Sequence, residues 1–549
     1  MLAAAVSDKT FGREVLASAI PVLVEFSAEH APSHATLNDL CSELVGRVKV
    51  VRVDVDRHPA LKDEYGVRGL PTHILFKYAK PVARRLGGLQ SKAELEEWID
   101  GALILALATR RVSAAQSATE FVMSNGMAVV VIPDHRAPVI THMVWYRVGS
   151  ADEPKDFSGI ARLVAYVTLK SLDKIADGSF TKAISRIGGE TNAASYRDAT
   201  VFWQRVPSEQ LKTAMELEVD RMVNLRLTDD DVATERGAIL EQRRSAIANN
   251  PGARLVEEMN AGLYRAHPYG LPAIGLPSEV AWLSLGDVLR FHKLHYAPNK
   301  AILVVSGDVT PEEVKRLANE TFGRIPANPY APQRPRLRAP SQIAARRLAL
   351  DDPRSDTARF YRAFAVPGYA TAVHGEVEAL DVLTKILAAG TASRLYRKLV
   401  IEDKVATSVW GSYGSTVEAG ELVLMILATD ADLRAIETGV DDVLEDIRKN
   451  GVTQDELAGA KRFLVANYIY DGADQLGLSF RYGWAAAHGL TIKDAENWPS
   501  AISRISAADV AKVATKYVIA RRSVTGWLSC RRNGKNAQLG RFKSRSGVG

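Results

Sequence analysis

The feature that most constrains this chain of 549 residues is an internal repeat. Residues 285–305 (LGDVLRFHKLHYAPNKAILVV) parallel residues 505–524 (ISAADVAKVATKYVIARRSV). In both segments an acidic residue opens a predicted helix, an aromatic residue closes it and an apolar strand follows. These residues are Asp287 and Tyr296 in the first copy, and Asp509 and Tyr517 in the second. Duplication predicts two similar lobes of helices and strands, of roughly 200 and 185 residues.

A proline-rich stretch joins the two predicted lobes. It runs from about 325 to 346 and contains Pro326, Pro329, Pro332, Pro335 and Pro340. Prolines at this density favour a stiff, extended connection over a packed element.

The N-terminal part of the chain has a different pattern. Apolar, β-branched runs at 22–26, 48–55 and 72–76 alternate with helical patterns, and 92–103 predicts a closing amphipathic helix. This alternation indicates a small α/β domain over 1–105. We therefore expect a linker at 106–119, lobes at 120–325 and 347–528 joined by 326–346, and a tail at 529–549.

Charge and cysteine content exclude several classes of function. The net charge of +6 resides entirely in the tail, so we expect no nucleic-acid groove in the folded part. The only cysteines are Cys41 and Cys530, which supports neither a disulfide framework nor a cysteine metal site.

No segment is expected to enter a membrane. The apolar run at 102–108 has seven residues, far too few to span a bilayer, and residues 1–11 lack the pattern of a secretory signal. We expect a cytoplasmic location, with the periplasm as the alternative.

The N-terminal domain resembles thioredoxin. The resemblance is carried by VLVEFSAEH at 22–30 and YGVRGLPT at 65–72. The family's Cys-Gly-Pro-Cys positions hold Ala31, Pro32, Ser33 and His34, so no thiol is present for disulfide exchange. Pro71 matches the family's cis-proline, which implies a docking edge for an extended peptide. A purely structural appendage is the alternative.

Residues 118–528 resemble the pitrilysin, or insulinase, family of zinc peptidases, which includes the mitochondrial processing peptidases. The ordered motifs are VGSADEP at 148–154, GG at 188–189, ERGAILEQRR at 235–244, AHPYG at 266–270 and YAPNKAILVVSGDV at 296–309. The resemblance implies two α+β lobes that form a clam.

These peptidases bind zinc with an inverted HxxEH motif and a glutamate from a later helix. In this chain the positions of the motif's two histidines hold Arg162 and Tyr166, and the position of its general base holds Ala165. The position of the glutamate from the later helix holds Gln242, or Glu241 if the register is shifted by one residue. Arginine has no lone pair for a metal and alanine accepts no proton, so we expect no zinc cofactor and no intact catalytic residue.

In the second lobe the family uses an arginine and a tyrosine seven residues apart to contact the substrate. Arg362 and Tyr369 have this spacing, and both can donate hydrogen bonds to an oxyanion. Alternatively, Arg362 is a surface residue and Tyr369 a core ring. The other histidines offer little for a substitute metal site: His292 and His295 fit a solvated helix face, and a metal at His30 and His34 is not expected.

The resemblance implies a non-catalytic subunit that binds peptide or unfolded protein and pairs with a homologous HxxEH-bearing chain. Two alternatives remain open. The chain is a stand-alone peptide-binding or chaperone-like module, or it is an active zinc endopeptidase.

Overall fold

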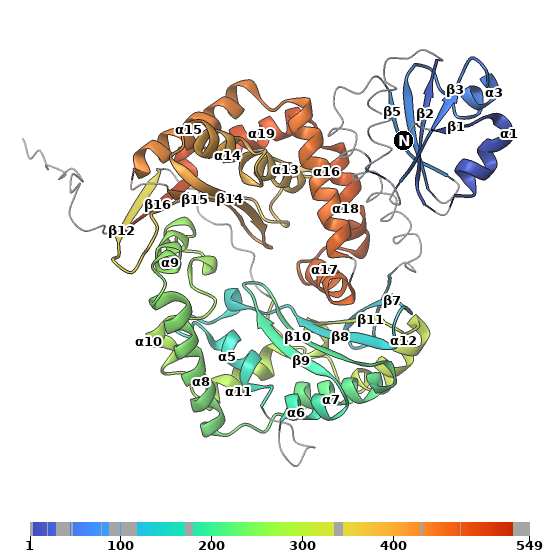
Figure 1. The fold of residues 1–549 in the computed structure, drawn as a ribbon. Helices are drawn as coiled ribbons and strands as arrows, with labels where there is room; N and C mark the ends of the chain where they lie inside the picture. The colour runs from blue at the N-terminus through green and yellow to red at the C-terminus, as the bar shows by residue number, and fades with distance from the viewer. Residues whose placement is uncertain are drawn as a thin grey trace, which may run out of the picture. The chain divides into compact units, whose positions relative to one another are not determined.

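A computed structural model describes residues 4–18, 20–28, 44, 48–77, 80–86, 99, 118–170, 179–333, 344–428, 432–472 and 474–530. The chain divides into two compact units, residues 1–115 and 116–549. The second unit contains both lobes (Figure 1).

The first unit is built on a five-stranded sheet in the order β1-β3-β2-β4-β5. The strands are β1 (Ala4–Ala5), β2 (Val22–Ser27), β3 (Lys49–Asp54), β4 (Thr72–Lys77) and β5 (Lys80–Leu86). β3 runs parallel to β1 and β2, whereas β4 is antiparallel to β2 and β5. The helical segments are α1 (Asp8–Phe11), η1 (Gly12–Leu16) and α3 (Pro59–Glu64). The three predicted strands are confirmed. The positions 31–34 and His30 lie outside the described residues, as does the predicted helix at 92–103 apart from residue 99.

The first lobe contains a six-stranded sheet in the order β6-β7-β11-β8-β10-β9. The strands are β6 (Thr119–Val122), β7 (Ala128–Pro133), β8 (Val139–Tyr146), β9 (Glu190–Ser195), β10 (Thr200–Pro207) and β11 (Ala301–Gly307). β6 and β7 form a hairpin at Asn125-Gly126, a dipeptide that favours tight turns, and Gly126 has a φ of 85°. β9 forms one edge of the sheet.

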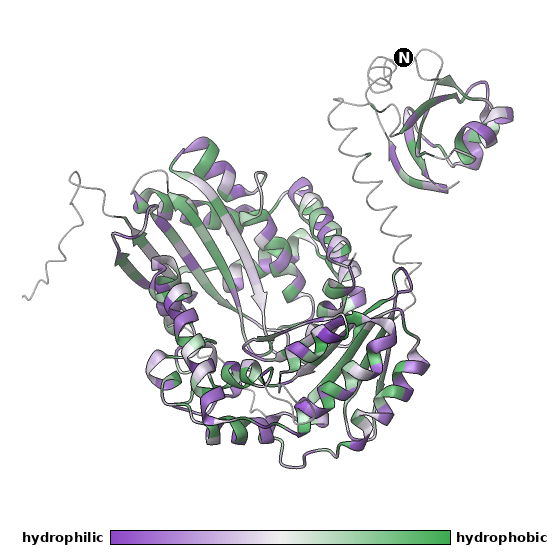
Figure 2. Cartoon of the chain, turned by 60° about the horizontal axis from the view of Figure 1, so that its bottom comes forward, coloured by the Kyte–Doolittle hydropathy of each residue, from purple (hydrophilic) through white to green (hydrophobic). Residues whose placement is uncertain are grey.

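Amphipathic helices cover one face of this sheet. They are α5 (Ile160–Val167), α6 (Phe180–Arg186), α7 (Leu211–Val223), α8 (Asp229–Arg243), α11 (Leu285–His295) and α12 (Pro311–Glu320). The lobe also contains η4 (Arg244–Ala248), α9 (Pro251–Leu263) and α10 (Pro277–Val280). Figure 2 shows hydrophobic residues concentrated on the strands and mixed with polar residues along the helices, as expected where each helix buries one stripe.

The second lobe has a five-stranded sheet in the order β12-β16-β13-β15-β14. The strands are β12 (Arg346–Asp351), β13 (Arg359–Val366), β14 (Ala406–Ser415), β15 (Gly420–Ala428) and β16 (Ser523–Ser529). The helical segments are α13 (Glu376–Ala388), α14 (Arg394–Tyr396), η8 (Arg397–Glu402), α15 (Leu433–Asn450), α16 (Gln454–Asp471), α17 (Gln475–Ala487), α18 (Ile492–Arg504) and α19 (Ala507–Tyr517).

The repeat that the sequence indicates is present in the structure. Ser284 and Asp287 form a capping box at the start of α11, and Ser506 and Asp509 form the same box at the start of α19. The strand that follows, β11 or β16, lies inside its sheet and pairs in parallel with the first long strand of its lobe, β7 or β12. The acidic residue therefore starts each helix by capping its free backbone N–H groups.

The two lobes exchange a helix. α9, from the first lobe, packs Leu255 and Met259 against Tyr361 and Val524 of the second lobe's sheet. α17, which lies in the second lobe's sequence, packs against β8 and β11 of the first lobe. At that contact a Cβ on Gly483 would come within 2.0 Å of Trp145 Nε1. Each sheet thus has an apolar face that is covered by a helix from the other lobe.

Candidate functional site

Helix α5 carries three of the four positions assigned to zinc chemistry, and it begins at a tightly packed glycine. Gly159, the N-cap residue, has a φ of 90°, and a Cβ there would meet Val280 at 2.7 Å. The Glu153 carboxylate accepts hydrogen bonds of 3.0 Å from the backbone N–H groups of Gly159 and Ala161. Burial raises the pKa of Glu153 to about 8, although both hydrogen bonds favour its ionised form.

The side chains of Arg162 and Gln242 meet between α5 and the end of α8. Arg162 Nη2 donates a hydrogen bond of 3.0 Å to Oε1 of Gln242. The same guanidinium lies 5.2 Å from the ring centre of Tyr166, one turn later on α5. The structure therefore brings together the residues at both predicted histidine positions and at the distal glutamate position.

The contact also distinguishes the two possible registers on α8. Gln242 faces Arg162, whereas Glu241 forms an exposed ion pair with Arg244. A second connection between α5 and α8 joins Lys170, which follows α5, to Glu235 at 2.8 Å. The two connections join α5 and α8, which run antiparallel, near both ends of their contact. They do so without a metal.

Ala165 lies on another side of α5. It is fully buried and belongs to the apolar core of the first lobe, with Leu163 and Val164. No group of three histidine, cysteine, aspartate or glutamate side chains suited to a metal occurs in the part of the chain that the structure describes.

A free sheet edge lies beside this helix. β9 pairs only with β10 among the described strands, and α5 packs against it. Tyr196, directly after β9, lies near Tyr166, and burial raises the pKa of Tyr196. An edge strand offers backbone donors and acceptors to an extended peptide. No motif within this strand predicts the free edge, although the GG motif at 188–189 immediately precedes it.

The structure places the two residues of the predicted arginine–tyrosine pair in separate settings. Arg362 is only 3% exposed and lies on the face of β13 that packs against helices of its own lobe. Its guanidinium binds Glu437 at 2.6 Å and also binds Asp441 and Thr525. Alternate residues of a strand point to opposite faces, so Tyr361 and Ala363, rather than Arg362, contact α9 of the other lobe.

Tyr369 lies after β13, away from that network. Its backbone N–H donates to the carbonyl of Thr416, and its ring makes an edge contact of 6.4 Å with His488. Burial raises its pKa, with further contributions from Asp381 and Glu378. A seven-residue spacing does not by itself specify which face of the strand a side chain occupies.

One further predicted position, Pro71, lies in the first unit. The Leu70–Pro71 peptide bond is cis, as the thioredoxin resemblance implies. In the same sheet Glu25 and His73 are fully buried and pair at 3.1 Å.

The prediction that His292 and His295 lie on a solvated helix face is wrong. The two side chains are 7% and 6% exposed, and His292 stacks on Tyr296 at 4.7 Å. Burial lowers the pKa of His292 to about 3 and that of His295 to about 4. With Val288 and Phe291 they form the i, i+3, i+4, i+7 stripe of a buried helix face.

The AHPYG motif joins the lobes. The Tyr269 hydroxyl donates to Asp198 at 2.7 Å, and His267 pairs with Glu418 of the second lobe at 3.0 Å. Asp198 also accepts a hydrogen bond from the backbone N–H of Val417. In the sequence this motif supports the family resemblance but does not indicate the role of its residues.

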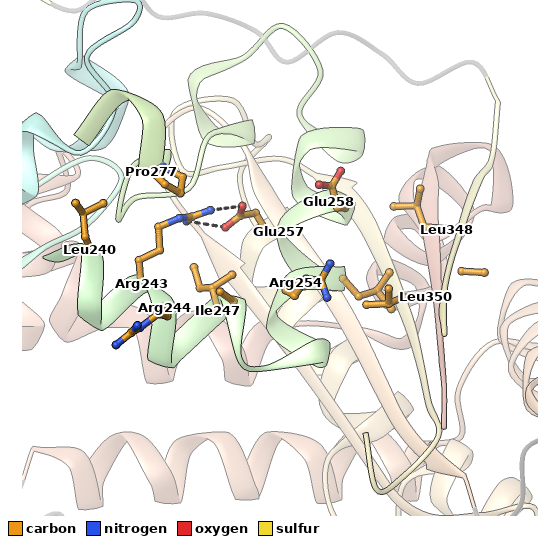
Figure 3. Close-up of a pocket in the computed structure, with 13 residues that line it drawn as sticks. Leu240, Arg243, Arg244, Ile247, Arg254, Glu257, Glu258, Pro277, Leu348 and Leu350 are labelled. Carbon is orange, nitrogen blue, oxygen red and sulfur yellow. Dashed lines mark hydrogen bonds and ion pairs between the residues drawn. The ribbon is translucent and has the colours of Figure 1, made fainter. Parts of the chain in front are cut away.

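A cavity of about 410 Å³ lies beside the first strand of the second lobe (Figure 3). Its walls come from α8, η4, α9 and α10 of the first lobe and from β12 of the second. Apolar side chains such as Ile247, Leu255 and Leu350 line it, and Arg243 forms a double hydrogen bond with Glu257 at 2.9 and 2.6 Å.

Comparison with known proteins identifies three matching families. Insulinase (Peptidase family M16) matches residues 128–275, the Peptidase M16 inactive domain matches 283–464, and Thioredoxin matches 3–101. The chain belongs to the M16 peptidase family. It carries both M16 domains behind a thioredoxin domain, as the sequence motifs indicated.

Relatives of this M16 chain are named as zinc proteases. Zinc protease PqqE of Helicobacter pylori is 28% identical over 414 residues, which cover 74% of this chain and 91% of that protein. An uncharacterized zinc protease of Mycobacterium tuberculosis is 25% identical over 379 residues, covering 69% and 85%.

Solved structures show the same M16 fold. A protease from Helicobacter pylori superposes with a TM-score of 0.71 at 25% identity, over 76% of this chain and all of that one. The peptidase M16 inactive domain from Pseudomonas fluorescens gives 0.69 at 18% identity, over 77% and 100%. Among the described residues, none of the helices combines the length and apolar character needed to cross a bilayer.

Proposed function

We propose that this M16 chain is a peptide-binding subunit without its own zinc chemistry, and that it acts with a homologous HxxEH-bearing chain. The observation that carries the proposal is the hydrogen bond between Arg162 and Gln242. It fills the space between the predicted ligand positions with a cation and an amide.

The donor set argues against zinc at this place. A guanidinium is protonated at all physiological pH values and repels a divalent cation. Tyr166 lies against that guanidinium, and the side chain at the general-base position is a buried methyl group. A catalytic zinc needs three protein ligands and an open position for water, which these residues do not provide.

The edge of β9 supports peptide binding. It lies beside α5 and is not paired by any other described strand, so an extended peptide can add to it through backbone hydrogen bonds. This observation also favours the second candidate function, a stand-alone peptide-binding module, because it requires no partner chain.

Co-expression with an HxxEH-bearing M16 chain from the same organism tests the proposal. Hydrolysis of fluorescein-labelled casein is measured for each chain alone and for the mixture, with zinc determined on each purified chain. We expect zinc on the partner only and a rise in hydrolysis of at least tenfold on mixing. A partner with glutamine in place of its HxxEH glutamate should show no rise.

The remaining outcomes separate the alternatives. Absence of a rise, together with binding of a labelled casein-derived decapeptide to this chain alone, would favour the stand-alone module. Alternate N-methylation of that peptide should weaken its binding at least tenfold, because methylated amides cannot donate to an edge strand. Stoichiometric zinc and chelator-sensitive hydrolysis by this chain alone would refute both proposals.

A further inference from the structure

The outer edge of β12 differs from the equivalent edge in the first lobe. β7 and β12 occupy the same place, since each pairs in parallel with the strand that follows the repeated helix. β6 covers the outer edge of β7, but within the described ranges no strand covers that of β12. Uncovered edges are normally protected by charge, by bulges or by a partner strand.

We propose that β12 pairs with β12 of a second copy of this chain, antiparallel and in a register centred on Ala349. A two-fold axis perpendicular to the sheet keeps the same face up in both copies, so only residues on the same face lie opposite each other. In this register Ala349 faces itself, Leu348 faces Leu350, and Arg347 faces Asp351.

The sequence Arg-Leu-Ala-Leu-Asp at 347–351 is self-complementary in this arrangement. Each end places a guanidinium opposite a carboxylate, the leucines lie opposite each other, and the smallest side chain lies on the axis. Residues directly opposite in an antiparallel pair lie about 4.5–5.5 Å apart, where opposite charges stabilise the pairing.

The charged groups are positioned for this role. Arg347, Ala349 and Asp351 are the exposed residues of the strand, and the side chain of Arg347 is 69% exposed. Arg347 also contacts Glu437 at 2.9 Å, which holds its guanidinium over the strand. The ion pairs between Arg347 and Asp351 would be intermolecular, one at each end of the six-residue strand.

The cavity in Figure 3 provides an apolar surface on the other face. Leu348 and Leu350 line it together with Ile247 and Leu255, so the leucines of a second copy would extend this surface. Arg354, just after β12, donates to the carbonyl of Ala248 at 3.1 Å, which places η4 near the Asp351 end. The two-fold axis places the second η4 at the opposite end.

Disulfide trapping tests the register. In a Cys41→Ser/Cys530→Ser background, Ala349→Cys brings two thiols together across the axis, and mild oxidation should convert most of the protein to a covalent dimer. Arg347→Cys is the matched control, since its two copies lie four residues, or about 13 Å, apart along the strands. Equal trapping of both variants, or no trapping of Ala349→Cys, would overturn the register.

Charge reversal tests the pairing itself. Sedimentation velocity should show a concentration-dependent dimer of the full chain, and Asp351→Arg should raise its dissociation constant at least tenfold. The double variant Arg347→Asp/Asp351→Arg should restore the dimer, because it exchanges the charges in both pairs. The proposal would be overturned if the chain stayed monomeric up to about 100 µM, or if Asp351→Arg left the dissociation constant of the dimer unchanged. Retained hydrolysis with an HxxEH-bearing partner would show that such a failure does not affect the proposed function.

Discussion

The guanidinium of Arg162 donates to the side-chain amide of Gln242 across α5 and α8, 3.0 Å from nitrogen to oxygen. Together with the Lys170–Glu235 pair, this contact connects α5 and α8, the two helices on which the resemblance to zinc peptidases placed the metal-ligand positions. The two helices of this chain are therefore held together by hydrogen bonds and charge.

Restoring the three ligands should create a metal site. The triple variant Arg162→His/Tyr166→His/Gln242→Glu places two imidazoles one turn apart and a carboxylate opposite them, a set suited to zinc. We expect about one zinc per chain by elemental analysis. Because Ala165 supplies no base, the variant should still fail to hydrolyse peptides until Ala165→Glu is added. The matched control replaces Gln242 by alanine beside the two histidines and should bind zinc at least tenfold more weakly.

Gly483 should be essential for packing between the lobes. A Cβ there would lie 2.0 Å from Trp145 Nε1, so Gly483→Ala should lower the free energy of unfolding by about 1–3 kcal/mol or more. Gly459 is the control, since a Cβ on this helical glycine meets nothing within 4 Å. Gly459→Ala should be neutral or stabilising by up to about 1 kcal/mol in urea titrations. Equal effects would mean that the Trp145 contact is not tight.

The buried pair of Glu218 and Arg221 should be sensitive to loss of one partner. Both side chains are fully buried, and Arg221 Nε donates to Glu218 at 3.0 Å. Glu218→Ala leaves a buried guanidinium without its carboxylate and should cost about 3–5 kcal/mol. Glu216, on the same helix, forms an exposed pair with Lys212, so Glu216→Ala should change stability by less than about 1 kcal/mol.

Buried His292 should make the protein less stable in acid. Its pKa is about 3 when folded, so between about pH 6.5 and 3 the unfolded chain takes up a proton that the folded chain excludes. The free energy of unfolding should therefore fall as pH falls, by up to about 1.4 kcal/mol per pH unit from this group.

A non-titrating substitution tests this pH dependence. His292→Gln should flatten the pH dependence of urea unfolding between pH 6.5 and 4, whatever its effect at neutral pH. Parallel curves for wild type and His292→Gln would show that another group dominates.

Local patterns predicted the secondary structure well. The β-branched runs and the acidic helix starts each depend on neighbouring residues, and each appears where expected. The M16 and thioredoxin resemblances were confirmed for the same reason, since they rest on contiguous motifs.

Features that depend on which way a side chain points were harder to predict. Arg362 has the expected spacing from Tyr369 but lies on the helix-covered face of its strand. The spacing of His292 and His295 alone fits a solvated helix face, but Val288 and Phe291 complete a buried stripe with them. The pairing of His267 with Glu418 joins residues 151 positions apart, a distance over which no local pattern carries information.

The exchange of α9 and α17 makes the two lobes mutually dependent. If either lobe were produced alone, the apolar sheet face that normally meets the other lobe's helix would be exposed to water. Gene fission at the proline-rich connection would therefore yield two aggregation-prone fragments instead of two modules. Recombination with other members of the family should thus be tolerated for the whole lobe pair but not for a single lobe.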